Sequence, residues 1–444
     1  MTTSSRFFTG WRKGLLVALL CYSALHLASA VLRYNPWTAP EVSGDFRQVY
    51  TDALDFRLHW EQTGKFPVAP VEGLRVYHGL PANFLLFPFT YLEFTYVDHF
   101  FYLLQFLLFP AAIFLLLKAV RTDSSPNLTE IALAVLLIWN FKPFLETLAL
   151  HKMEGIEFFL ICLALVTFKK KRDFLTGALL LTAASLKYLP GILLVYFLFK
   201  REFKVLLGAL GAGLAFLVFM LIFFGPSSME ALFRHPLDLL FRLDLASNFH
   251  AANIEWQTVS GTVNRWFAPP ATGNLVEWLG VGFAYPLTRT SLPVGISIVL
   301  KVLIGGIYLY VIRNRWAGDQ RKEKWPLYLL EISLTLIMLI VWIQAIRIGY
   351  ASLLLPAYLT VALLFYRQWN LFRLKEKVLF GLAYALGATI IPMGLVDKLF
   401  PHPVWGPVYA KLYYWWGLPF YGFMMLGVCL LLCHKRMSRA AFHG

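Results

Sequence analysis

The sequence predicts an all-α protein, a polytopic bundle of membrane-spanning helices. Two observations carry this prediction, the composition and the spacing of the apolar segments. Of the 444 residues, 59% are hydrophobic and only 15% are charged, whereas a soluble domain is closer to half apolar and a quarter charged. Apolar runs suited to spans of about 20 residues recur along the whole chain. We therefore expect a single integral membrane domain over residues 1–444, with loops and short interfacial helices at its outer face.

Basic residues separate the apolar runs and predict their direction. Clusters such as Lys169–Arg172 and Arg367–Lys377 fall at alternate ends of the runs, as they do when Lys and Arg mark cytoplasmic loops. This alternation predicts about twelve spans in a multi-pass protein of the inner membrane, with both termini in the cytoplasm. Their approximate bounds are 15–32, 97–117, 128–145, 155–168, 174–187, 189–199, 205–224, 291–312, 326–345, 350–366, 378–395 and 412–433.

The net charge of +15 belongs to these basic loops. In a soluble chain such a charge would suggest a nucleic-acid partner. No nucleic-acid motif and no glycine-rich phosphate loop accompanies it in the sequence. We therefore expect the lipid bilayer, and no nucleic acid, as a partner.

Two segments near the N-terminus allow more than one interpretation. The run from Leu15 to Leu32 follows basic residues and includes Ala28-Ser29-Ala30, a pattern that also occurs in cleaved signal peptides. Its length and the acidic residues behind it favour an uncleaved anchor. The segment from Pro81 to Leu92 is apolar but too short to span, and counting it as a span would place Lys169–Arg172 outside. We expect a re-entrant or interfacial helix there, at the outer face.

Two long segments are left on the outer side, at about 33–80 and 225–290. Both are rich in Pro, Trp, Tyr, His and charged residues. Irregular backbone persists at membrane depth only where protein or a water-filled cavity surrounds it. We therefore expect these loops to fold over the outer ends of the helices.

Three carboxylates follow the first apolar run, Asp45, Asp52 and Asp55. Carboxylates beside a bilayer are costly to place in lipid and usually line a functional cavity. On a helix, Asp45 and Asp52 share a face, and so do Asp52 and Asp55. One interpretation is a general base for an acceptor hydroxyl, or a metal ligand. The alternative is a solvated interfacial helix whose acids pair with Arg47 and Arg57.

Cationic side chains lie at the outer ends of later spans. Lys187 ends one span immediately before Tyr188-Leu189-Pro190, and Arg347 lies in the loop before Tyr350. Both side chains fit a bound phosphate. Both equally fit a long cationic side chain that reaches the membrane interface from a helix end.

The loop from Asn248 to Phe267 combines polar side chains with tryptophan. It holds His250, Trp256, Gln257 and Arg265. Such a mixture suits a sugar, whose ring faces stack on aromatic rings while its hydroxyl groups need donors and acceptors. An exposed loop of mixed polarity is the alternative. His78, His151 and Glu154 also face outward and allow both interpretations.

Metal and nucleophile motifs are missing from the sequence. No metal-spaced set of His, Cys and Glu occurs, and no serine lies in a nucleophile elbow. We expect no cofactor, with a divalent metal left open.

Taken in order, these segments resemble the membrane glycosyltransferases of the GT-C superfamily. The closest resemblance is to glycosyltransferase family 87, whose best-known members are polyprenyl-phosphate-mannose-dependent mannosyltransferases. It runs from about Leu15 to Pro356. Asp45-Phe46 with Tyr50 fits the family's Asp-Phe-x3-Tyr segment, and Lys187 with Pro190 fits its Lys-x-x-Pro signature. Looser matches are Tyr77 and Pro81 for a Tyr-x-Pro-rich turn, and Gln257, Gly261 and Arg265 for an Asn-Gln-Ser-x2-Gly-x3-Arg stretch.

Two family features are replaced in this chain. Family members often carry Gly-Gln-x-Asn before the fourth span, where this sequence reads Met153-Glu154-Gly155. They also often carry His-Tyr six residues before the late proline, where Gly349 precedes Tyr350. The helper histidine is therefore missing, which suggests a divergent donor or acceptor.

The resemblance implies an inverting glycosyltransferase whose donor is a sugar on polyprenyl phosphate and whose acceptor is a lipid or glycan. Asp45 would act as the base, on the periplasmic side. Lys187, with Arg265 or Arg347, would hold the leaving phosphate. Substrate-binding candidates are Tyr50, Tyr77, His78, His250, Trp256, Gln257 and Tyr350, and secondary candidates are Asp52, Asp55 and Glu154. The alternatives are a polytopic transporter or lipid flippase, and a scaffold subunit that has lost catalysis.

Overall fold

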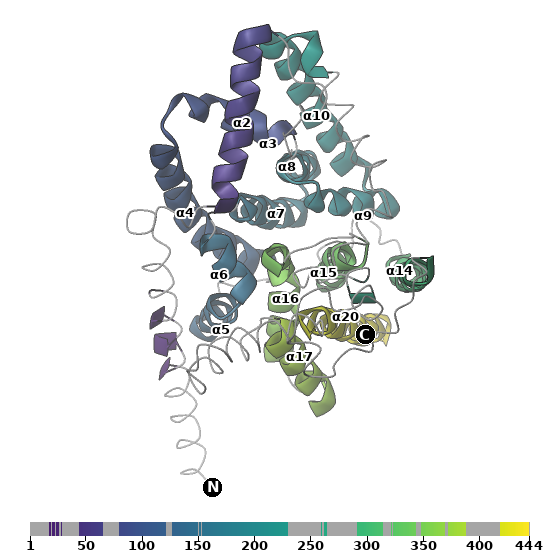
Figure 1. Ribbon diagram of the computed structural model, residues 1–444. Helices are drawn as coiled ribbons and strands as arrows, with labels where there is room; N and C mark the ends of the chain where they lie inside the picture. The colour runs from purple at the N-terminus through teal and green to yellow at the C-terminus, as the bar shows by residue number, and fades with distance from the viewer. Residues whose placement is uncertain are drawn as a thin grey trace.

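The computed structural model describes residues 44–64, 80–120, 127–149, 153–229, 291–313, 323–342, 348–368, 372–387 and 418–443, with isolated positions elsewhere. Every regular element in this part of the chain is a helix. Figure 1 shows these helices packed together, many of them viewed along their axes. The predicted all-α class is confirmed.

Five helices are long and apolar enough to cross a membrane. They are α4 (Phe94–Val120), α10 (Phe203–Phe224), α14 (Ser291–Ile312), α15 (Trp325–Trp342) and α20 (Leu418–His443). Shorter helices pack among them, namely α5 (Leu128–Trp139), α7 (Glu154–Lys169), α8 (Asp173–Leu186), α9 (Ile192–Lys200), α16 (Leu355–Arg367) and α17 (Leu374–Gly387). The chain is therefore a membrane protein, and the count of about twelve spans stays a prediction. Of the expected first span, 15–32, the structure describes positions 17, 18, 20–22, 24, 25 and 28, and all of them are helical.

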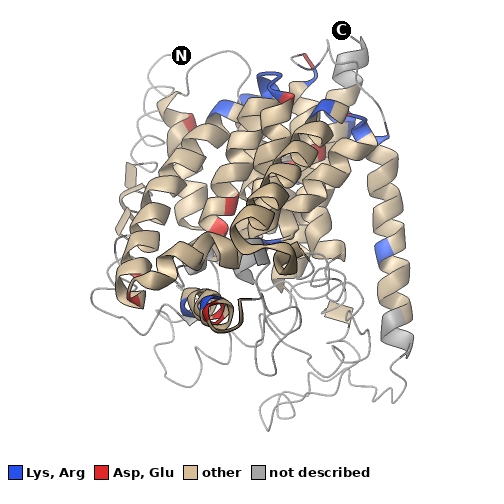
Figure 2. Ribbon diagram, turned by 90° about the horizontal axis from the view of Figure 1, so that it is seen from above, with Lys and Arg blue, Asp and Glu red and all other residues tan. Residues whose placement is uncertain are grey.

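Most of the described Lys and Arg residues gather at one end of the bundle, which we call the basic end (Figure 2). Lys118, Lys169, Lys200 and Arg367 lie in the last turns of α4, α7, α9 and α16 and belong to it. Helix α2 (Gly44–Thr63) crosses the opposite end and appears end-on in Figure 2, where the spanning helices run up the page. We call that opposite end the α2 end.

Helix α2 lies inside the segment 33–80 that the sequence predicts as an outer loop. Apolar residues three or four apart give the helix one buried face. They are Phe46, Val49, Tyr50, Ala53 and Phe56. The helix ends before Gly64, whose φ of 64° suits a glycine at a helix C-terminus. The loop therefore contains an amphipathic helix of 20 residues.

Two short consecutive helices pack against α2. Helices α3 (Leu80–Leu86) and η1 (Phe87–Tyr91) fill the segment expected to be re-entrant or interfacial, and both pack against α2. The Tyr50 hydroxyl donates to the Leu92 carbonyl at 2.6 Å, and the Arg57 guanidinium donates to the Thr90 carbonyl at 2.7 Å. These bonds fix α2 across the bundle.

Prolines explain two of the differences between the expected helices and the observed ones. The expected helix 128–145 breaks at Asn140–Phe141 into α5 and α6 (Lys142–Ala149). Pro143 has no backbone N–H and disfavours helical backbone at the residue before it, so it suits only a helix start. The expected helix 350–366 begins as η5 (Ile348–Leu354), and α16 starts at Leu355 with Pro356 in its first turn.

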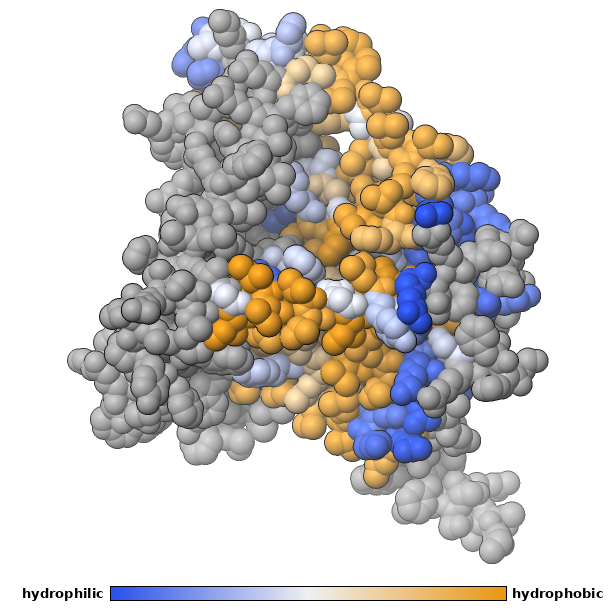
Figure 3. Space-filling model, turned by 90° about the vertical axis from the view of Figure 1, so that its right-hand side faces the viewer, coloured by the Kyte–Doolittle hydropathy of each residue, from blue (hydrophilic) through white to orange (hydrophobic). Residues whose placement is uncertain are grey.

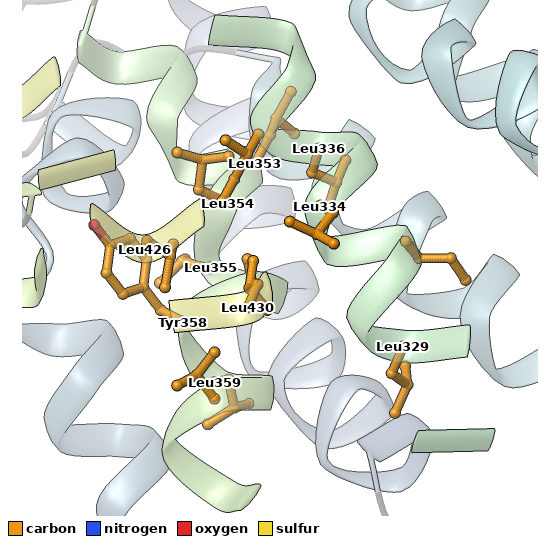
Figure 4. Packing of buried hydrophobic residues seen from close by; sticks show 14 of the residues in the cluster. Leu329, Leu334, Leu336, Leu353, Leu354, Leu355, Tyr358, Leu359, Leu426 and Leu430 are labelled. Atoms are coloured by element: carbon orange, nitrogen blue, oxygen red, sulfur yellow. The ribbon is translucent and has the colours of Figure 1, made fainter. Parts of the chain in front are cut away.

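Burial separates a central helix from peripheral ones. In α15, 89% of the span is buried inside the protein, against 22% in α10 and 17% in α14. Leucines of α15, α16 and α20 pack in one cluster with Tyr358, which lies beside Leu355, Leu426 and Leu430 in Figure 4. Figure 3 shows apolar side chains over the described helices on the face that carries α14, with hydrophilic residues toward one edge. Apolar surface of this extent is what a lipid environment covers.

Buried ion pairs join the two halves of the chain at the basic end. Arg321, only 3% exposed, pairs with Asp173, the first residue of α8, and with Glu202, the residue before α10. Lys200 at the end of α9 pairs with Glu331 of α15 at 2.7 Å. We call these contacts the basic-end clamp.

Candidate functional site

A buried ion pair lies where α7 begins and α8 ends, at the α2 end. Lys187 Nζ donates to Glu154 Oε1 at 2.7 Å. Glu154 is the first residue of α7, and Lys187 directly follows the last residue of α8. The Glu154 side chain is 1% exposed and the Lys187 side chain 12%. The extended backbone of Lys187 then leads into the short helix η2 (Leu189–Gly191), which contains Pro190.

A second acid on α7 has no such partner. Glu157 lies one turn beyond Glu154 and is fully buried. Within the described part of the chain, neither of its side-chain oxygens accepts a hydrogen bond. The carbonyl oxygen of the buried Gln105 side chain on α4 also has no donor there. Buried acceptors without donors are energetically costly, so natural proteins keep them mainly at functional sites.

A histidine and an aspartate form another buried pair beside α7. His151 Nδ1 lies 2.7 Å from Oδ1 of Asp98 on α4, and both side chains are almost fully buried. The imidazole also contacts the Tyr102 ring, with the ring centres 4.8 Å apart. His151 has a φ of 51°, which is uncommon for a residue other than glycine.

The first turn of α2 is joined to this region by a small apolar cluster. Phe46 is fully buried and belongs to the same cluster as Met153 and Leu186, which precede Glu154 and Lys187. Asp45 lies in the same turn of α2 as Phe46. The side chain of Asp45 falls outside the described residues. The structure therefore brings the backbone of Asp45 to the region of the ion pair.

The other candidates on α2 differ in their surroundings. Tyr50 uses its hydroxyl to hold α2 against Leu92. Asp52 is 6% exposed, and burial together with the neighbouring charge of Asp55 raises its pKa to about 7. Burial also raises the pKa of Asp55.

The arginines on α2 do not pair with these acids among the described contacts. Arg47 lies over the Phe94 ring at 4.9 Å, and Arg57 lies over the Tyr91 ring at 4.5 Å. Asp52 is thus a buried acid rather than part of a solvated surface.

Most remaining candidates lie outside the described residues. They are Tyr77, His78, His250, Trp256, Gln257, Arg265 and Arg347. Tyr350 belongs to η5, which packs against α6 and α7, but its side chain is not described. Within the described ranges, no group of three His, Cys, Asp or Glu residues is placed to hold a metal ion.

Sequence reasoning missed three residues of this region, Asp98, Gln105 and Glu157, and left His151 undecided. Asp98 and Glu157 carried a usable signal, because each is an acid within the first turns of an apolar helix. The place where the chain departs from the family's Gly-Gln-x-Asn pattern is the place of Glu154, the partner of Lys187. That departure was a further signal.

Comparison with protein families gives a match. The model of glycosyltransferase family 87 matches residues 78–288. No curated protein and no solved structure matches the chain. The matched stretch contains His151, Glu154 and the Lys187-x-x-Pro190 signature, and Asp45 precedes it. The match and the apolar helices together identify the chain as resembling the membrane glycosyltransferases of family 87.

Proposed function

We propose that the protein transfers a sugar from a polyprenyl-phosphate donor to a hydroxyl group of a lipid or glycan acceptor. The observation that carries this proposal is the buried Lys187–Glu154 pair, joined through one apolar cluster to the turn of α2 that holds Asp45. A base and a fixed cation near each other are what a single displacement at a sugar phosphate needs. The family match supports the reaction class.

In the proposed reaction, Asp45 takes the proton of the acceptor hydroxyl as its oxygen attacks the anomeric carbon. The bond from that carbon to the phosphate oxygen breaks, and its electron pair leaves with polyprenyl phosphate. One displacement inverts the anomeric carbon. Lys187, with Arg265 or Arg347, offsets the charge that develops on the phosphate. An ammonium has three donors, so Lys187 can hold Glu154 and a phosphate oxygen together.

The same proposal assigns the sides of the membrane. Positively charged loops favour the cytoplasm, so the basic end lies there and the α2 end faces outward. The donor then enters from the outer leaflet of the inner membrane. Trp256, Gln257, His250, Tyr77, His78 and Tyr350 supply ring faces and polar groups for the sugar and the acceptor.

The decisive experiment measures transfer by purified protein in lipid nanodiscs, with a labelled polyprenyl-phosphate sugar and membrane-lipid acceptors. Asp45→Asn keeps the shape of the side chain but removes the base, and we expect transfer to fall roughly 10²–10⁴-fold with an unchanged melting temperature. Glu61→Gln, an exposed change on the same helix, is the matched control and keeps full activity.

Two outcomes would contradict the proposal. Near-normal transfer by Asp45→Asn would remove Asp45 as the base. Movement of the donor across the membrane without a new glycosidic bond would favour the transporter alternative.

A further inference from the structure

The backbone of His151 is held in an uncommon conformation. Among the described residues, His151, Lys171 and Arg201 are the ones other than glycine with positive φ. Lys171 and Arg201 are exposed and follow the ends of α7 and α9, where left-handed backbone is common. His151 is 1% exposed and lies before a helix, not after one. Left-handed backbone is unfavourable for a residue that carries a side chain, so the surrounding contacts must hold it.

One contact that holds His151 is its bond to Asp98. The bond is 2.7 Å long and nearly excluded from solvent, and it ties the turn between α6 and α7 to α4. A carboxylate bonded to one ring nitrogen fixes the orientation of an imidazole. The Tyr102 ring packs beside the imidazole and limits its movement further.

The start of α7 lacks the usual device that fixes a helix end. Its N-cap residue, Met153, makes no side-chain hydrogen bond to the first turn. The position of Glu154, the next residue, therefore depends on the turn that precedes it. Glu154 in turn holds Lys187, whose four-carbon side chain has many conformations when it is not bound.

We infer that His151 and Asp98 are positioning residues for the Glu154–Lys187 pair. They fix the start of α7, so that Glu154 presents the Lys187 ammonium in one place. If Lys187 holds the donor's phosphate, as proposed above, the pair of His151 and Asp98 sets the affinity for polyprenyl phosphate without touching it.

The test measures two quantities for each variant, the Kd for polyprenyl phosphate alone and the kcat and KM of transfer. His151→Asn keeps a residue that tolerates positive φ but removes the imidazole, and Asp98→Asn keeps the shape of the acid. We expect each change to raise the Kd about 10-fold and to lower kcat/KM roughly 10–100-fold, as changes behind a binding residue do. Lys171→Gly, a change at a matched backbone conformation, leaves both quantities unchanged.

A double-mutant cycle separates positioning from general support of the fold. In a Lys187→Met background, His151→Asn is expected to change the Kd less than twofold, because the cation that it positions is gone. The inference would be overturned if His151→Asn raised the Kd by the same factor with and without Lys187→Met. It would also be overturned if His151→Asn and Asp98→Asn both kept the wild-type Kd. Should His151→Asn fail to fold, Asp98→Asn decides in the same cycle.

The binding readout also keeps the two proposals apart. Wild-type protein that binds polyprenyl phosphate but transfers no sugar would overturn the proposed function, while the cycle on Kd still decides the positioning role. Wild-type protein that does not bind polyprenyl phosphate would overturn both.

Discussion

At the scale of single residues, Asp52 couples the stability of the fold to pH. Its pKa is about 7 in the folded protein against 3.8 ordinarily, because burial disfavours the charged form. The folded state therefore holds a proton that the unfolded state releases between these values, and stability falls as pH rises from about 4 to about 7. Above pH 7 both states are ionised and the loss is complete.

We expect Asp52→Asn to remove this dependence. The variant melts at a higher temperature than the wild type at pH 8, and the difference shrinks as the pH is lowered and vanishes near pH 4. At about 1.4 kcal/mol per pKa unit, the effect is a few kcal/mol at most. Melting curves of both proteins between pH 5 and 8 measure it, and parallel curves would show that Asp52 ionises normally.

A substitution of Glu157 is expected to lower the rate of transfer without lowering the stability of the fold. A buried acid without a donor destabilises the fold, so Glu157→Gln is expected to melt at the same or a higher temperature while transfer falls about 10-fold. Glu331→Gln is the matched comparison, since Glu331 is equally buried but bonded to Lys200 and Tyr196. That variant is expected to lose about 3 kcal/mol. Equal destabilisation in both variants would contradict the contrast.

At the scale of elements, the crossing of α8 and α10 depends on two glycines. A side-chain carbon on Gly208 would collide with the Phe174 carbonyl of α8, and one on Gly177 would collide with the Val205 carbonyl of α10. Small residues allow membrane helices to approach this closely. Since α8 ends at Leu186, its position also determines that of Lys187.

We expect Gly208→Val to separate the two helices, with a loss of about 1–3 kcal/mol or more and a clear fall in kcat/KM. Gly211→Val, on the same helix, places its side chain in open space. It should behave nearly like the wild type. Melting temperature and transfer rate of the two variants test this, and equal losses would show that helix propensity rather than the crossing is responsible.

At the scale of the whole molecule, the orientation in the membrane is open to direct measurement. In a variant without its four cysteines, single cysteines at positions 63 and 171 mark the exposed end of α2 and the basic end. We expect a membrane-impermeant thiol reagent to label position 63 in intact cells with a permeable outer membrane, and position 171 only after lysis. Labelling of position 171 from outside would place the candidate site in the cytoplasm.

The bounds of a helix could be predicted from the sequence where charged or helix-breaking residues mark both ends of an apolar run. Elsewhere the sequence alone did not predict them. The expected helices 155–168, 174–187 and 205–224 agree closely with α7, α8 and α10. Charged residues flank the first two runs, and Lys204 and Gly225-Pro226 bound the third. Helix α2 lies in a segment that the sequence assigned to an outer loop, with an interfacial helix as one interpretation of its acidic residues, because the segment has low hydropathy. Lys187 was visible at a helix end, but its pairing with Glu154 depends on how α7 and α8 pack, which one sequence does not encode locally.

The basic-end clamp has a mechanical consequence for the molecule. Arg321 and Lys200 join helices from both halves of the chain by buried charge pairs, and pulling apart such a pair exposes an uncompensated charge. The clamped end therefore acts as a pivot. Any widening that admits a lipid between the helices grows with distance from that pivot, and it is greatest at the end that α2 crosses.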